Sequence, residues 1–154
     1  AVSGATSTTT LNGTVSLGTG GAVVGTTATQ TLTNKTITAR VSSTTSIASP
    51  LAWNSDNFDE YAATAQAVAL TISADAGTPT DGRKIIFRFT CDATIRVITF
   101  TGAVAGGFKP IGVTLTVSGS NFTYSLTASK TTYFGAIYNA SSARWEITAI
   151  AQEA

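Results

Sequence analysis

Three acidic side chains, Asp56, Asp59 and Glu60, form the densest group of potential metal ligands in the sequence. Carboxylates of this kind bind Ca²⁺, but an EF-hand loop needs ligands at alternate positions and a glycine, and this segment has neither. The segment begins with residues that cap helices, and acids favour the first turn of a helix. We therefore expect residues 54–61 to form a short helix or a turn, with cation binding as the alternative.

The side chains that common catalytic mechanisms need are scarce. The sequence has no histidine, which excludes Ser-His-Asp and Cys-His catalytic sites as well as histidine metal sites. The one cysteine, Cys91, cannot form an internal disulfide or a zinc cluster. Ser129 and Lys130 are neighbours, but neighbouring residues of a strand point to opposite faces, which argues against a Ser-Lys nucleophile. We expect no enzymatic activity and no cofactor.

Residues 102–109 (GAVAGGFK) resemble part of a phosphate-binding loop, but Phe108 stands where lysine must follow the last glycine, so we interpret them as a turn.

Trp145 alternates with Ile147 and Ala149 in the last apolar run and is expected to anchor the core. Five other aromatic residues lie in apolar runs, and aromatic side chains at alternating strand positions are typical of a core. The alternative for them is a platform that stacks on sugars. The five residues are Phe122, Tyr124, Tyr133, Phe134 and Tyr138.

The charge balance also limits the partners. Of the 154 residues only 11% are charged, and 9 basic against 8 acidic residues leave a net charge of +1. Nucleic-acid binders usually carry a basic excess, so we expect no nucleic-acid partner. No apolar run approaches the length of a membrane-spanning helix, and residues 1–5 do not have the pattern of a signal peptide. We therefore expect no membrane partner.

The composition changes near Pro50. Residues 1–49 contain only two charged residues and no aromatic residue, and they are mostly Thr, Ser, Gly, Ala and Val. They have too little bulky apolar surface for a core of their own, but their β propensity exceeds that of a plain linker. We predict an extended N-terminal arm that lies on another subunit, with a disordered tail as the alternative. The candidate arm contacts are Leu32, Lys35, Ile37 and Arg40.

The second part of the chain, residues 50–154, contains every Trp, Tyr and Phe of the sequence. It has seven runs of alternating apolar and polar residues, separated by Gly, Pro, Asn and Ser: 66–73, 83–90, 94–100, 111–117, 122–127, 131–138 and 143–150. Short strands at this spacing predict an all-β fold, either an antiparallel β-sandwich or a barrel-like knob of about seven strands.

One predicted hairpin gives a candidate subunit interface. If Thr90 pairs with Thr94, one face of the hairpin collects Ile85, Phe87 and Phe89 with Ile95, Val97 and Thr99, and we expect this face in the core. The opposite face mixes apolar residues with arginine, which is common at protein interfaces. Packing under a loop of the same chain is the alternative. The candidate interface residues are Ile86, Arg88, Arg96, Ile98 and Phe100.

Several segments carry a resemblance to a known domain: residues 65–72 (AQAVALTI), 77–88 (GTPTDGRKIIFR), 130–133 (KTTY), 137–140 (IYNA) and 144–153 (RWEITAIAQE). Together they resemble a small β domain that recurs in structural proteins of tailed bacteriophages, often at the C-terminus of tail-fibre or virion-surface proteins. Residues 31–38 (TLTNKTIT) are similar to a short repeat of phage fibre and spike shafts. The resemblance spans residues 61–154 and implies no catalytic residues.

This resemblance implies a virion structural protein, made in the host cytoplasm and located on the outer surface of the capsid or tail. The chain departs from the fibre pattern because it has almost no shaft and no separate tail-attachment domain. We therefore expect a trimeric capsid decoration (cement) protein that stabilises the head. Its partners would be itself, as a homotrimer, and the major capsid protein or another virion protein. The alternative is a short tail or head fibre or spike protein that contacts a host surface glycan.

Overall fold

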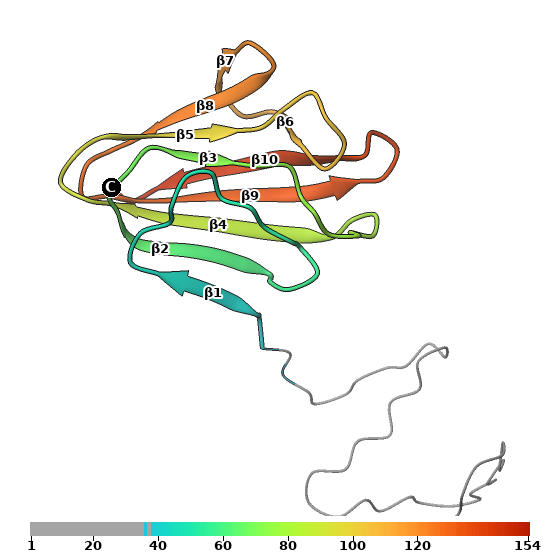
Figure 1. The fold of residues 1–154 in the computed structure, drawn as a ribbon, viewed down its shortest axis with the longest axis horizontal. Coiled ribbons are helices and arrows are strands. Elements are labelled where there is room, and N and C mark those ends of the chain that lie inside the picture. The colour runs from blue at the N-terminus through green and yellow to red at the C-terminus, as the bar shows by residue number, and fades with distance from the viewer. Residues whose placement is uncertain (1–35, 37) are drawn as a thin grey trace, which may run out of the picture. The chain divides into compact units, whose positions relative to one another are not determined.

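The computed structural model describes residue 36 and residues 38–154, and every regular element among them is a strand (Figure 1). The strands are β1 (Val41–Thr44), β2 (Glu60–Gln66), β3 (Leu70–Ile72), β4 (Lys84–Cys91), β5 (Arg96–Phe100), β6 (Phe108–Pro110), β7 (Thr116–Ser118), β8 (Asn121–Leu126), β9 (Thr131–Asn139) and β10 (Arg144–Gln152). The predicted all-β class is confirmed. Three predicted arm contacts, Leu32, Lys35 and Ile37, lie outside the described residues.

The strands form two sheets that enclose one core. The six-stranded sheet has the order β1-β2-β4-β9-β10-β6, and the four-stranded sheet has the order β3-β5-β8-β7. Four pairings are parallel, namely β1 with β2, β2 with β4, β3 with β5 and β6 with β10, so both sheets are mixed and the antiparallel prediction was wrong for them. Parallel neighbours arise because the chain changes sheet at each step from β2 to β5.

The predicted hairpin between residues 83–90 and 94–100 is wrong for the same reason. β4 pairs with β2 and β9, whereas β5 lies in the other sheet between β3 and β8. The connection is held by Asp92, whose carboxylate accepts two hydrogen bonds from the Arg96 guanidinium at 3.1 and 2.6 Å. Because β5 faces the core from the opposite side, Ile98 and Phe100 are buried and Val97 is exposed.

Large aromatic side chains fill the space between the sheets. Trp53, which precedes β3, contacts Phe87 of β4, Phe108 of β6 and Trp145 of β10 at ring-centroid distances of 5.2, 5.8 and 5.6 Å. Trp145 is fully buried, which confirms its predicted place in the core. Its predicted companion Ala149 is exposed, because a register shift after Ile147 turns the rest of β10 over.

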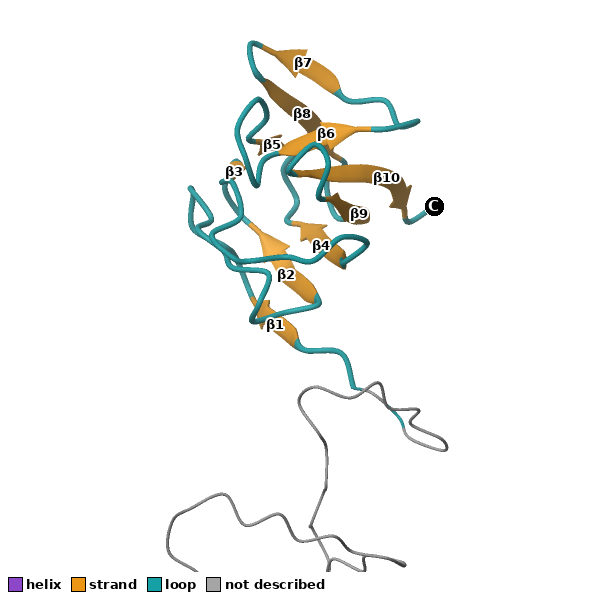
Figure 2. Cartoon of the chain, turned by 90° about the vertical axis from the view of Figure 1, so that its right-hand side faces the viewer, coloured by secondary structure: helices purple, strands orange, loops and turns teal. Residues whose placement is uncertain are grey.

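Residues 38–49, which the composition placed in the arm, are part of the sandwich. The compact unit begins at Thr38, and β1 extends the six-stranded sheet beside β2. Ile47 is buried, and the buried side chain of Gln66 bonds to its backbone twice, with Ile47 N–H donating to Oε1 at 2.8 Å and Nε2 donating to the Ile47 carbonyl at 2.9 Å. Figures 1 and 2 show β1 at one border of the sandwich and β7 at the opposite border.

Candidate functional site

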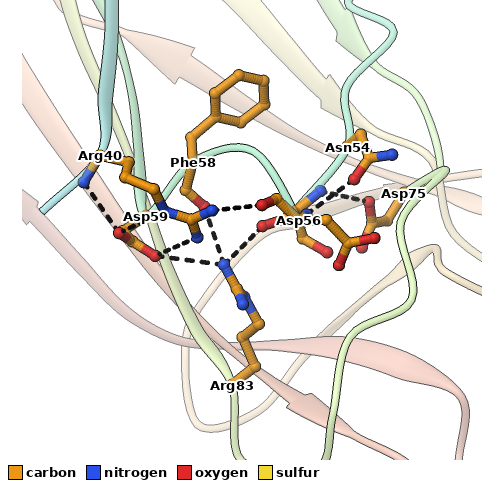
Figure 3. Close-up of polar contacts among 8 residues, drawn as sticks. Arg40, Asn54, Asp56, Phe58, Asp59, Asp75 and Arg83 are labelled. Atoms are coloured by element: carbon orange, nitrogen blue, oxygen red, sulfur yellow. Dashed lines mark hydrogen bonds and ion pairs between the residues drawn. The ribbon is translucent and has the colours of Figure 1, made fainter. Parts of the chain in front are cut away.

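Arg40 fastens the start of the domain to the loop before β2 (Figure 3). Its guanidinium forms a two-bond contact with Asp59, with Nε 3.2 Å from Oδ2 and NH2 2.9 Å from Oδ1. Its backbone N–H also donates to Oδ2 of Asp59 at 2.9 Å, and its NH1 donates to the carbonyl of Asp56. We call this arrangement of Arg40 on Asp56 and Asp59 the Arg40 clamp.

A second arginine reaches the clamp from the loop before β4. Arg83 NH2 donates to the Ser55 carbonyl at 2.6 Å and to Oδ1 of Asp59 at 3.2 Å (Figure 3). The hydrogen bonds from Arg40 lower the pKa of Asp59 from its ordinary value of 3.8 to about 2, and both arginine charges add to the effect. Asp59 is therefore ionised at neutral pH and engaged by guanidinium donors, which does not suit a proton-transfer role.

The two other acids of this segment are also engaged within the chain. Asp56 Oδ2 accepts hydrogen bonds from the backbone N–H and the hydroxyl of Thr78, each at 3.0 Å, and Glu60 pairs with Arg88 at 2.6 Å. Residues 55–57 form a turn, which confirms that alternative over a helix. Within residues 38–154 no three His, Cys, Asp or Glu side chains are grouped so that they could hold a metal ion.

The candidate subunit interface is divided by the fold. Ile98 and Phe100 are fully buried, so their assignment to an exposed face was wrong. Arg96 is held by Asp92 in the connection between the sheets. Only Ile86 and Arg88 lie together on β4, on the side of the six-stranded sheet that faces away from the four-stranded sheet. We call this side the outer face.

Ile86 stands in an apolar part of the outer face. It is 42% exposed, and its partner across the ladder on β9 is Gly135, which has no side chain to fill the space beside it. A shallow depression of about 210 Å³ results, lined by Lys84, Ile85, Ile86, Gly135, Ala136, Ile137 and Thr148. Exposed apolar surface with a charged rim is typical of surfaces that bind other proteins.

The five aromatic residues considered for stacking on sugars differ in their burial. Phe134 is buried, and Phe122, Tyr124 and Tyr138 are partly buried and pack against the core, which confirms the core assignment for these four. Tyr133 is 44% exposed on the outer face. It borders a depression of about 430 Å³, whose other lining residues are Thr131, Ala151, Gln152 and Glu153. Tyr133 is thus the one of the five that could stack on a ligand.

The structural roles of Arg83 and Asp75 were not predicted from the sequence. Asp75 accepts hydrogen bonds from the backbone N–H groups of Ser55 and Gly77 at 2.9 and 2.8 Å, and from Trp145 Nε1 at 3.1 Å. These bonds join segments up to 70 positions apart, and no local pattern marks them. Cys91 is buried: its burial raises the pKa of the thiol, and Sγ donates to the Thr94 carbonyl at 2.9 Å.

Comparisons of the chain with protein-family models, with curated proteins and with solved structures found no match. In the part of the chain that the structure describes, no helix is long and apolar enough to cross a membrane.

Proposed function

We propose that this chain is a structural protein of a tailed-bacteriophage particle, a homotrimeric decoration protein that stabilises the capsid from its outer surface and catalyses no reaction. The resemblance of residues 61–154 to a phage virion domain supports this assignment. The observation that carries it is the Arg40 clamp. The compact unit begins at Thr38, so the arm comprises residues 1–37, and both the backbone and the side chain of Arg40 are bonded to the domain just after the arm ends.

The arm and the domain have different tasks in this proposal. The arm has a single charge, Lys35, and no aromatic residue, so it suits strand-like hydrogen bonds and small apolar contacts with the major capsid protein or another virion protein. The sandwich is a rigid body that holds the arms together. When three arms are joined, one released arm stays close to its binding surface, which raises the overall affinity without new contacts.

The outer face supplies the surface for the trimer. Ile86 and Arg88 lie on it, next to Gly135 and Ile137 of β9. The aliphatic part is exposed around the shallow depression beside Ile86, whereas the Arg88 guanidinium is held by Glu60, so the surface presents few unpaired charges that contact would have to desolvate. A single interface repeated around a three-fold axis closes such an assembly.

Particles that lack the protein test the proposal. They should release DNA on heating or on transfer to low-magnesium buffer, while they still adsorb to cells at the wild-type rate. Added wild-type protein should restore their stability, and a variant without residues 1–37 should fold but not attach to them. Particles that remain intact under these conditions and fail to adsorb would contradict the decoration role.

Tyr133 favours a second candidate function, a short fibre or spike protein that contacts a host surface glycan. Its exposed ring lies beside polar groups of Thr131, Gln152 and Glu153, a combination that suits stacking on a sugar with hydrogen bonds at its rim. In that case Tyr133→Ala should reduce adsorption at least tenfold, and Tyr133→Phe should retain most of it. Val117→Ala, a change at an exposed site of the other sheet, is the matched control.

A further inference from the structure

A sheet of this kind has two edges, and the two sheets of the sandwich leave four edge strands: β1, β6, β3 and β7. An uncovered edge presents unpaired backbone N–H and C=O groups that bind any suitable strand, so proteins usually protect it. The four edge strands differ in how far their backbone groups are covered, and this comparison identifies a binding surface.

Two of the four edges are closed. At β6, the Phe108 N–H donates to the Thr101 carbonyl at 2.8 Å, and Pro110 has no N–H to offer. At β3, the segment before Trp53 covers the edge. Leu51 N–H donates to the Thr71 carbonyl at 2.8 Å, and the Thr71 N–H donates to the Ser49 hydroxyl oxygen at 3.0 Å.

The two remaining edges, β7 and β1, have no strand beyond them among residues 38–154. β7 has three residues and lies at the border of the sandwich opposite β1 (Figure 2). β1 has four residues, VSST, with no charge, no proline and no register shift, so its short length is its one protective feature among those common in edge strands. The arm joins the domain directly before this edge.

We propose that the free edge of β1 binds residues 31–38 of a second copy of the chain, so that neighbouring copies exchange the last part of their arms. The inference extends the proposed trimer and depends on it. Residues 31–38 (TLTNKTIT) are rich in β-branched residues and contain one charge, Lys35. Thr and Ser pairs across neighbouring strands stabilise such a contact.

The backbone of β1 indicates which groups form this contact. The Arg40 carbonyl accepts the Glu60 N–H of β2 at 3.2 Å, so Arg40 directs its backbone toward β2. Successive residues of a strand direct these groups to alternate sides, so Ser42 and Thr44 bond to β2. Val41 and Ser43 therefore direct their N–H and C=O groups to the free edge.

The same chain cannot supply the whole pairing segment. Arg40 already continues the ladder with β2, and its N–H is bonded to the Asp59 carboxylate. A reversal that brought the arm back beside β1 would have to use residues 36–39, which include part of residues 31–38. A second copy can present that segment intact. Because the donor segment and the β1 edge are different surfaces, the contact is head-to-tail, and the three-fold symmetry of the proposed trimer would close it as a ring.

An exchange experiment with two versions of the full-length chain tests the inference. Copy one is ¹⁵N-labelled and carries Thr36→Pro, which impairs its arm as a donor and leaves β1 intact. Copy two is unlabelled and carries Ser43→Pro, which removes an outward N–H of β1 and leaves the arm intact. The readout is hydrogen exchange of the Val41 and Ser43 amides in copy one.

We expect these amides to exchange rapidly in copy one alone and at least tenfold more slowly after copy two is added. The doubly substituted chain should give no protection, and a copy two with Val117→Pro instead of Ser43→Pro should still protect. If Ser43→Pro does not fold, unlabelled wild-type chain replaces it as the donor. Protection in copy one alone, or none after addition of an intact arm, would overturn the inference. The experiment uses purified protein, so its failure is distinct from failure of the capsid-stabilising role.

Discussion

Truncation of Trp145 should lower the free energy of unfolding of the domain more than truncation of any other side chain. It is fully buried, contacts Trp53 and Tyr138, and donates its indole N–H to Asp75. Trp145→Ala removes this packing and leaves the Asp75 carboxylate with one donor fewer, so we expect a loss of ~3–5 kcal/mol in the free energy of unfolding. Chemical denaturation measures it. Tyr133→Ala, at an exposed site, should change stability by less than ~1 kcal/mol, and equal losses for both variants would contradict the core assignment.

Asp59 should make the stability of the domain depend on acid. Its pKa is about 2 in the folded protein and 3.8 ordinarily, so the folded state stabilises the charged form. This contribution is fully present above about pH 4 and is lost as the pH falls toward 2. Because the side chain is 40% exposed, solvent screening limits it to roughly 1 kcal/mol.

The Asp59→Asn variant isolates this contribution. The difference in unfolding free energy between wild type and the variant, measured from pH 6 to pH 2, should shrink as the pH falls through this window. A difference that stays constant over that range would show that the ion pairs with Arg40 and Arg83 do not stabilise the fold.

Single residues were predicted from the sequence where a local pattern determines their place. Trp145 lies between Arg144 and Glu146 in an alternating run, and it is buried as that pattern predicts. Ile98 and Phe100 were wrongly assigned to an exposed face. β4 and β5 each have an apolar side, and only the pairing of the strands decides which side of each strand faces the core. The ion pairs of Asp59 could not be predicted from the sequence, because Arg40, Asp59 and Arg83 come from three loops that only the tertiary fold brings together.

At the scale of elements, β1 and the segment after it should be indispensable to the sandwich. A chain without residues 1–37 keeps β1, Ile47 and the Arg40 side chain, so its melting temperature should stay within a few degrees of wild type. A chain without residues 1–49 also loses both bonds between Ile47 and the buried Gln66 side chain, which keeps only its bond to the Val68 carbonyl. A buried amide oxygen without its donor and a lost apolar side chain cost several kcal/mol together.

Thermal unfolding followed by circular dichroism compares the two truncations. We expect the shorter deletion to unfold cooperatively near the wild-type temperature and the longer one to unfold at least ten degrees lower. If both melt alike, residues 38–49 do not contribute to the core, and the boundary near Pro50 that the composition suggested would be the better one.

The alternation of apolar residues located seven runs, and strands occur in all of them, whereas β1, β2 and β6 were missed. β2 has the sequence EYAATAQ, in which small alanines replace the bulky residues of a usual strand. β6 has three residues, one of them a proline. The order of strands in the sheets was not predictable, because it depends on where the chain crosses between them.

At the scale of the whole molecule, the trimer should depend on the outer face. Native mass measurement should give three times the mass of one chain, and Ile86→Glu should shift the population toward monomers because it buries an unpaired charge at the contact. Val97→Glu, at a comparably exposed site of the four-stranded sheet, should leave the trimer intact. A wild-type chain that is monomeric at micromolar concentration, or equal effects of both substitutions, would contradict this surface as the interface.

The position of the Arg40 clamp has a mechanical consequence. A tether under tension pulls on the first residue of the domain, and a terminal strand fails most easily when it peels away from its neighbour one bond at a time. Peeling of β1 from β2 would have to start at Arg40, where the guanidinium, the N–H and the carbonyl are all bonded to the loop and to the first residue of β2. We therefore expect the clamp to transmit a force on the arm to the loop and to β2, so that β1 does not separate from β2 until the bonds of Arg40 break.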